Sequence, residues 1–151
     1  MNALELQVKQ LILFYENISI ENLSDLRNFY STQATFKDPF NEVLGIQKII
    51  QLFEHMFQSL ETPSFKVKEV VTQGEQTFLS WEFNYELKQL PKKGQMVIHG
   101  ASHIVWASDD LGYWRVKLHR DYWDAAEEVY EKIPIIGLLI RWLKKKIGAP
   151  L

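Results

Sequence analysis

The sequence predicts an α+β fold, with helices at both ends of the chain and long antiparallel strands between them. Three observations support this. Apolar residues recur at helical spacing along the first sixty residues. Between residues 64 and 123 the period changes to two, which is typical of strands with one buried face. The segment 125–151 then returns to a helical period.

Three helices are expected before the strands. Residues 3–18 carry one apolar stripe, and residues 46–60 keep the 3.6-residue period closely. A shorter helix between them has the stripe Leu23, Leu26, Phe29 and Tyr30. Residues 34–39 predict a short strand that Pro39 ends, and residues 40–45 predict a loop.

Four longer strands should follow, separated by turns at Gly74, 91–94 and 108–112. Their expected ranges are 64–73, 76–88, 95–107 and 113–123. Tight turns between consecutive strands produce an antiparallel meander. One face of this curved sheet should pack against the helices, which gives the α+β arrangement.

Composition excludes several classes of protein. The chain has 151 residues, a length that suits one domain. It has no cysteine, so disulfides, thiolate metal sites and cysteine nucleophiles are excluded. Its net charge of -2 lacks the basic excess of a nucleic-acid-binding domain. We find neither a secretory signal nor an apolar run long enough to span a bilayer, so a cytoplasmic protein is expected.

Three short segments suggest a family. They are the Ala34–Pro39 strand with its Asp-Pro ending, the helix start at Gly45, and the Arg120–Asp124 end of the last strand. In this order they resemble the nuclear transport factor two-like superfamily, in particular its SnoaL-like and ketosteroid-isomerase-like branch. The resemblance implies a cone-shaped curved antiparallel sheet wrapped around the N-terminal helices (a cystatin-like roll). It covers a domain at residues 1–124, and residues 125–151 would be a helical extension packed on it.

The resemblance also implies a pocket at the wide end of the cone and a homodimer formed through the outer face of the sheet. Members of the family include isomerases, cyclases and dehydratases, but also proteins that only bind or assemble, so the fold does not fix the function. We expect a small apolar or ring-bearing ligand and, if the chain is an enzyme, proton transfer without a cofactor. The alternative is a ligand-binding or dimeric assembly module without chemistry.

Asp38 and Tyr15 are the first two candidate catalytic residues. In ketosteroid isomerases the aspartate matching Asp38 is the general base, although an aspartate before proline also commonly organises a turn. Tyr15 matches their oxyanion-stabilising tyrosine, yet it also lies on the apolar stripe of its helix, where packing explains it. Those isomerases pair this tyrosine with a protonated aspartate, and the matching position here is Ser102.

His119 and Asp121 are the other two candidate catalytic residues. They lie two apart on the last strand and therefore share a face. Strict alternation along this strand would send them to solvent, opposite Trp114, Val116 and Leu118. The resemblance instead implies that both point into the pocket, where Asp121 would match the acid/base aspartate of SnoaL-like cyclases. A histidine beside it could shuttle a proton near neutral pH.

Aromatic side chains are the candidate ligand contacts. Trp81, Phe83 and Tyr85 share one strand face, which could be packed core or pocket lining. The full expected ligand-binding set is Phe53, Phe57, Trp81, Phe83, Tyr85 and Ser102. No metal site is expected, because His99 and His103 are separated by about 13 Å along their strand.

The C-terminal tail combines an apolar face with four cations and no acidic residue between Ile133 and Leu151. Such a helix can lie on an anionic membrane surface. More often it packs on its own domain or on a partner subunit. Nucleic acid is not expected as a partner, since the chain as a whole carries no basic excess.

Overall fold

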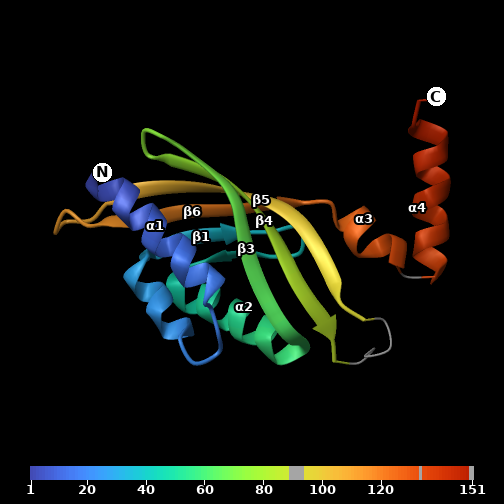
Figure 1. The fold of residues 1–151 in the computed structure, drawn as a ribbon, viewed down its shortest axis with the longest axis horizontal. Helices are drawn as coiled ribbons and strands as arrows, with labels where there is room; N and C mark the ends of the chain where they lie inside the picture. Colours follow the sequence, from blue (N-terminus) through green and yellow to red (C-terminus); the bar gives the residue numbers. More distant parts are fainter. Residues whose placement is uncertain (89–93, 133, 150–151) are drawn as a thin grey trace.

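The computed structural model describes residues 1–88, 94–132 and 134–149. It has a six-stranded curved sheet that does not close into a barrel, with helices packed on its inner side (Figure 1). The N-terminal helices are α1 (Ala3–Glu16), the 3-10 helix η1 (Leu23–Asn28) and α2 (Ile46–Ser59). The predicted α+β fold is therefore confirmed.

The sheet has the strand order β2-β1-β6-β5-β4-β3. Its strands are β1 (Tyr30–Lys37), β2 (Glu42–Leu44), β3 (Leu60–Gln73), β4 (Gln76–Leu87), β5 (Met96–Ser108) and β6 (Trp114–Trp123). Strands β3 to β6 form the predicted antiparallel meander. Strand β1 joins it by parallel pairing with β6. This pairing brings the end of β1 beside the end of β6. Asp38, which follows β1, therefore lies near Asp121 of β6.

Three predicted boundaries were wrong. Strand β1 begins at Tyr30 and not at residue 34. The segment 40–45, expected to be a loop, contains β2, which folds back antiparallel on β1. Strand β3 begins at Leu60, directly after α2, and not at residue 64. Of the predicted turn at 91–94, residues 91–93 lie outside the described part of the chain, while Gly94 has a φ of 70°.

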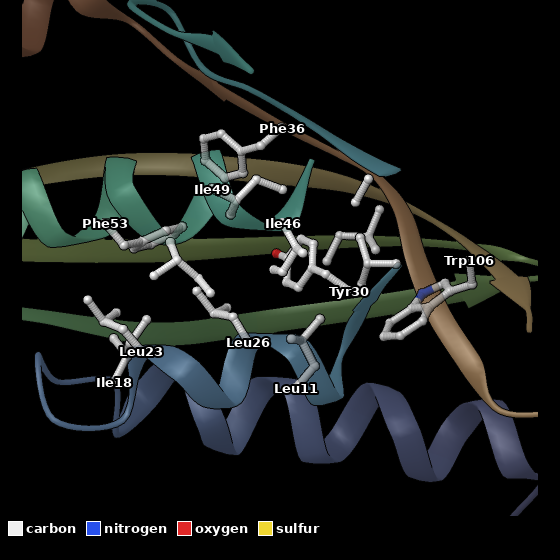
Figure 2. Close-up of a cluster of buried hydrophobic side chains, with 14 of the residues drawn as sticks. Leu11, Ile18, Leu23, Leu26, Tyr30, Phe36, Ile46, Ile49, Phe53 and Trp106 are labelled. Atoms are coloured by element: carbon white, nitrogen blue, oxygen red, sulfur yellow. The ribbon is translucent and has the colours of Figure 1, made fainter. Parts of the chain in front are cut away.

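The main core lies between the helices and the inner face of the sheet (Figure 2). It contains Leu11 of α1, Leu26 of η1, Ile49 and Phe53 of α2, and Trp106 of β5. A second buried cluster comprises Trp81, Phe83, Tyr85 and Ile98 on β4 and β5. Burial therefore follows the alternation predicted for β4, and the second cluster lies where the sheet extends beyond the main core.

A bulge at Lys117 changes which side chains of β6 face inward. Trp106 of β5 pairs with Val116, whereas its neighbour Val105 pairs with Leu118, so Lys117 is an extra residue in β6. Before the bulge Val116 is buried; after it His119 is buried. Strict alternation would have kept Val116 and Leu118 on one face and turned His119 outward. The bulge is the physical reason why the polar half of β6 faces the inside of the cone.

The tail contains α3 (Ala125–Glu128), the 3-10 helix η3 (Tyr130–Lys132) and α4 (Pro134–Ile147). The Asp124 side chain caps α3 by accepting hydrogen bonds from the backbone N–H groups of Ala126 and Glu127. In Figure 1, α4 stands at the opposite end of the molecule from the N-terminus, beyond α3. Among the helices of the described residues, none is long and apolar enough to cross a bilayer.

Candidate functional site

The centre of the candidate site is Asp121, near the end of β6. Its side chain is 15% exposed and lines a pocket of about 690 Å³. One carboxylate oxygen, Oδ1, lies 2.8 Å from Nε2 of His119 and accepts a hydrogen bond from the Ser102 hydroxyl at 2.5 Å. In the part of the chain that the structure describes, no hydrogen bond reaches its second oxygen, Oδ2. Among the described residues, Asp121 thus has one carboxylate oxygen held by two donors and one that receives no hydrogen bond.

A buried chain of hydrogen bonds lies behind Asp121. The Nδ1 atom of His119 is 2.5 Å from the Tyr30 hydroxyl, which in turn is 2.5 Å from the Tyr15 hydroxyl. His119 itself is only 4% exposed and packs against the ring of Phe36 at a centroid distance of 4.9 Å. Tyr15, Tyr30, His119 and Asp121 therefore form one connected series from α1, β1 and β6.

A second branch reaches Asp121 from β4 and β5. The indole N–H of Trp81 donates to the Ser102 hydroxyl at 2.8 Å, and that hydroxyl donates to Asp121. An indole can only donate, and a carboxylate can only accept, so the direction of this branch is fixed. On the other branch, the Tyr30 hydroxyl donates a hydrogen bond to Nδ1 of His119. The imidazole proton is then on Nε2, and this N–H donates to Asp121. Both branches then end on the same carboxylate oxygen.

Burial keeps the two tyrosines neutral. It raises the pKa of the Tyr15 phenol well above its ordinary range, and the nearby Asp121 carboxylate adds to the shift. The pKa of Tyr30 is also raised, chiefly by burial and then by Tyr15. Both phenols therefore act as hydrogen-bond donors at physiological pH and not as phenolates.

Three cavities are lined by Asp121. One, of about 490 Å³, has Lys37, Asp38 and Arg120 in its walls. The smaller of the other two, about 30 Å³, is lined by Tyr15, Ser102 and His119 together with Asp121. It is too small for a ring-bearing molecule, since one water needs about 10–15 Å³ of such space. The larger pocket has aromatic walls made by Phe65, Trp81, Phe83 and Tyr85. A ligand would therefore occupy the larger pocket and meet Asp121 at its wall.

Close packing of the pocket wall depends on a glycine. Gly100 of β5 pairs with Trp81 of β4. A Cβ atom at position 100 would come within 2.4 Å of the Trp81 ring. The indole can lie flat across β5 only because this position carries no side chain. Trp81 lines the smaller cavity and the larger pocket, so Gly100 helps to shape both.

Asp38 lines the same larger pocket as Asp121 but is engaged differently. Its Oδ1 accepts hydrogen bonds from the backbone N–H groups of Phe40 and Asn41 at 2.7 and 2.6 Å. The Asn41 side-chain amide also donates to both carboxylate oxygens at 3.1 Å. This is the turn-organising arrangement expected of an aspartate before proline.

The other predicted ligand contacts divide into three groups. Phe53, Trp81, Phe83 and Tyr85 line the larger pocket, while Ser102 lines only the smaller cavity. Phe57 lines neither and packs against the main core. Tyr15 also lines only the smaller cavity, where its hydroxyl is bonded to Tyr30.

Sequence reasoning missed Tyr30 and part of the pocket rim. Tyr30 was assigned to the apolar stripe of a helix, but it begins β1 opposite Val116. At the rim, Phe40 contacts the rings of Trp123 and Tyr130 at 5.2 and 6.0 Å. Val129 of the tail lines the pocket as well. Only the Asp-Tyr-Trp-Asp ending of β6 pointed to this region.

Of the remaining histidines, His55 lines the larger pocket, while His99 and His103 have partners outside the candidate site. His99 is 3.5 Å from Glu128 through Nδ1. His103 bonds Gln76 at 2.8 Å and stacks on Phe78. Within the described residues, no three histidine, aspartate or glutamate side chains are grouped so that they could hold a metal ion.

Comparison with known proteins gives the family. The sequence profile of the SnoaL-like domain matches residues 12–112, more than half of the chain. The chain therefore belongs to the SnoaL-like domain family, within the nuclear transport factor two-like superfamily. The match ends before β6, so His119 and Asp121 are placed by the structure and not by the profile. Among curated proteins, none matches the sequence.

Solved structures share the fold at low identity. A protein of Catenulispora acidiphila with a ketosteroid isomerase-like fold, solved with trimethylamine, superposes with a TM-score of 0.67 at 11% identity, covering 82% of this chain and 88% of that one. A protein of Jannaschia, provisionally described as a SnoaL-like polyketide cyclase, gives 0.65 at 13% identity, covering 80% and 87%. A nuclear transport factor two-like protein of Salmonella enterica gives 0.62 at 13%, covering 79% and 87%.

Proposed function

We propose that the chain binds a small apolar or ring-bearing molecule in the larger pocket and that Asp121 removes a proton from one of its carbon atoms. The observation that carries this proposal is the asymmetric engagement of the Asp121 carboxylate. Two donors hold Oδ1, no hydrogen bond from the described residues reaches Oδ2, and the Asp121 side chain lines the pocket. A carboxylate fixed in this way is a positioned general base.

The walls of the pocket support the ligand class. The rings of Phe65 and Phe83 stack at a centroid distance of 4.4 Å, and those of Phe83 and Tyr85 at 5.4 Å. Flat aromatic surfaces favour a flat apolar ligand, and a pocket of about 690 Å³ is within the range of small-molecule sites. Lys48 and His55 add polar groups among the lining residues.

The reaction class follows from a single carboxylate base. Proton removal next to a carbonyl leads to isomerisation, cyclisation or loss of a leaving group, and none of these needs a cofactor. In this proposal His119 and Ser102 position the carboxylate. Tyr30 holds His119 so that its Nε2–H donates a hydrogen bond to Asp121. The hydrogen bond between the hydroxyls of Tyr15 and Tyr30 extends this chain of contacts behind the base.

The test is elimination of nitrobenzisoxazole, a flat aromatic probe. A base removes the C–H proton of its isoxazole ring, the N–O bond breaks, and a coloured cyanonitrophenolate forms. We expect the wild-type chain to accelerate this step beyond acetate at equal carboxylate concentration. The Asp121→Asn variant should lose about a hundredfold or more. Asp110→Asn, in the exposed β5–β6 turn, is the matched control and should keep full activity.

A second candidate function is ligand binding without chemistry, which the predominantly apolar lining of the pocket favours. Native mass spectrometry of the purified chain would then find a retained small molecule. If wild type and Asp121→Asn show the same rate as acetate, catalysis by Asp121 is excluded and the binding function remains.

We also infer a homodimer through the outer face of the sheet. Val71 and Phe78 pair across β3 and β4 and are exposed, as is Tyr122 of β6. The Phe78 ring stacks on His103 at 4.3 Å, which extends this apolar patch across β5. Phe78→Glu should halve the particle mass in light scattering, whereas Leu111→Glu in the β5–β6 turn should not. A monomeric wild type would contradict the dimer.

A further inference from the structure

Helix α4 exposes a broad apolar side. On a helical projection the large apolar residues occupy roughly 200° of its circumference. The most exposed are Ile135 and Ile147, at 83% and 81%, and Leu138 is 65% exposed. Trp142 is also exposed on the same side, which Lys146 interrupts near the C-terminal end of the helix. A monomeric protein rarely leaves so broad an apolar surface in water without a use for it.

The opposite side of α4 is the one that holds it to the chain. Gly137 is buried, and a Cβ there would come within 2.2 Å of the Glu131 carbonyl oxygen. Arg141 donates to that carbonyl at 3.1 Å, and Lys144 pairs with the Glu131 carboxylate at 2.6 Å. The helix is therefore attached to η3 through its small and polar side, and its apolar side is directed away from that attachment.

The charge of the tail differs from that of the rest of the chain. Residues 134–151 contain four cations, Arg141 and Lys144 to Lys146, and no acidic residue. Since the whole chain has 17 cations and 19 acids, residues 1–133 carry 13 and 19, a net charge of -6. Two copies of α4 packed together would bring eight cations near one another without an acidic partner in either helix. Charge complementarity therefore favours an anionic surface over a second copy.

We propose that α4 lies flat on an anionic lipid bilayer, with its apolar side in the interface and its lysines at the headgroups. Fourteen residues make a helix about 21 Å long, enough to lie on a membrane surface and too short to cross it. Lys145 and Lys146 have long side chains that reach headgroup phosphates while their stems stay on the apolar surface. Attachment through Glu131 then holds the larger pocket close to the bilayer.

Vesicle flotation of the full chain tests this proposal. The vesicles are pure phosphatidylcholine, or phosphatidylcholine with one quarter phosphatidylglycerol, at physiological salt. We expect the chain to float only with the anionic vesicles and to be released by high salt. Leu138→Glu should abolish flotation, whereas Leu111→Glu, a still more exposed site outside the tail, should not change it.

Charge variants separate the electrostatic part. Lys145→Gln with Lys146→Gln should weaken binding to anionic vesicles roughly 25-fold, from about one fivefold factor for each lysine near the surface. Lys9→Gln with Lys117→Gln removes the same charge from exposed sites elsewhere and should have little effect. Circular dichroism of each variant confirms that it is folded.

A folded wild-type chain that floats with neither type of vesicle would overturn the proposal. If Leu138→Glu then also lowers the particle mass in light scattering, a second copy covers α4 instead of a membrane. Neither result depends on Asp121, so the proposed proton transfer is tested separately.

Discussion

Asp38 and Asp121 lie on the same pocket but have different partners. The Asp38 carboxylate is bonded to its own loop, mainly to backbone N–H groups two and three residues away. The Asp121 carboxylate is bonded to side chains from β5 and β6, which continue into buried tyrosines. Removing the first carboxylate would disturb a turn, whereas removing the second would disturb a network built from four strands and a helix.

This difference shows that an Asp-Pro motif and a pocket position are not sufficient to identify a base. A base needs an oxygen that is free to take a proton and a frame that holds the other oxygen still. Both oxygens of Asp38 accept a hydrogen bond from Asn41. Asp121 fits the requirement better, and the following predictions test that preference.

The largest effect is expected in the nitrobenzisoxazole assay. Asp121→Asn should lower the rate by about a hundredfold or more, because the base is lost. Asp38→Asn should lower it less than about threefold, because the asparagine oxygen still accepts the loop N–H groups and the base is intact. The opposite ranking would give Asp38 the role of base, as ketosteroid isomerases suggest.

Tyr30→Phe should have the next largest effect, through stability. It removes the hydroxyl that joins Tyr15 to His119 and leaves buried polar atoms without their partner, at a cost of about 1–3 kcal/mol. Urea unfolding monitored by tryptophan fluorescence measures this. Tyr15→Phe should cost less, since the contact between Tyr30 and His119 survives; equal costs would mean that the tyrosines do not act in series.

Asp38→Ala should destabilise the chain by about 1 kcal/mol, through lost hydrogen bonds in an exposed loop. Asp38→Asn is the control, because it keeps an acceptor. Hydrogen exchange should show faster exchange at the amides of Phe40 and Asn41 in the alanine variant alone. Unchanged exchange there would mean that the carboxylate does not organise the loop.

The smallest effect concerns alkaline pH. Burial raises the pKa of Tyr30 above the ordinary value of 10.0, so above that value the folded chain holds more protons than the unfolded chain. Stability is therefore complete well below pH 10 and decreases as the pH rises through it, by about 0.4 kcal/mol for such a tyrosine at pH 10. Urea midpoints at about pH 8 and pH 10 measure the loss, and Tyr30→Phe should show a smaller one.

Much of the fold was predictable because periodicity reports burial directly. The alternation around Trp81 identified β4 and its inner face, and the stripe around Phe53 identified α2. The short strand β2 was not predictable, because the three residues Glu42–Leu44 are too few to show an alternation. They form a strand because they pair with β1.

The site was predictable only in part. His119 and Asp121 were identified as candidates by a family resemblance, while local alternation argued against them. The bulge at Lys117 explains why both side chains face inward although local alternation turns them outward. It is visible only in the pairing register of β6 with β5. Tyr30 could not be placed, because its partners lie 15 and 89 residues away and no local pattern marks such contacts.

The extra residue at Lys117 leaves β6 with two halves whose alternations are out of step. One half fills the core with Val116, and the other carries His119 and Asp121 to the pocket. Loss of that one residue would keep His119 and Asp121 in the sequence and turn both side chains toward the solvent. In evolutionary terms, a single-codon insertion or deletion is enough to decide whether the polar half of this strand faces the water or the pocket.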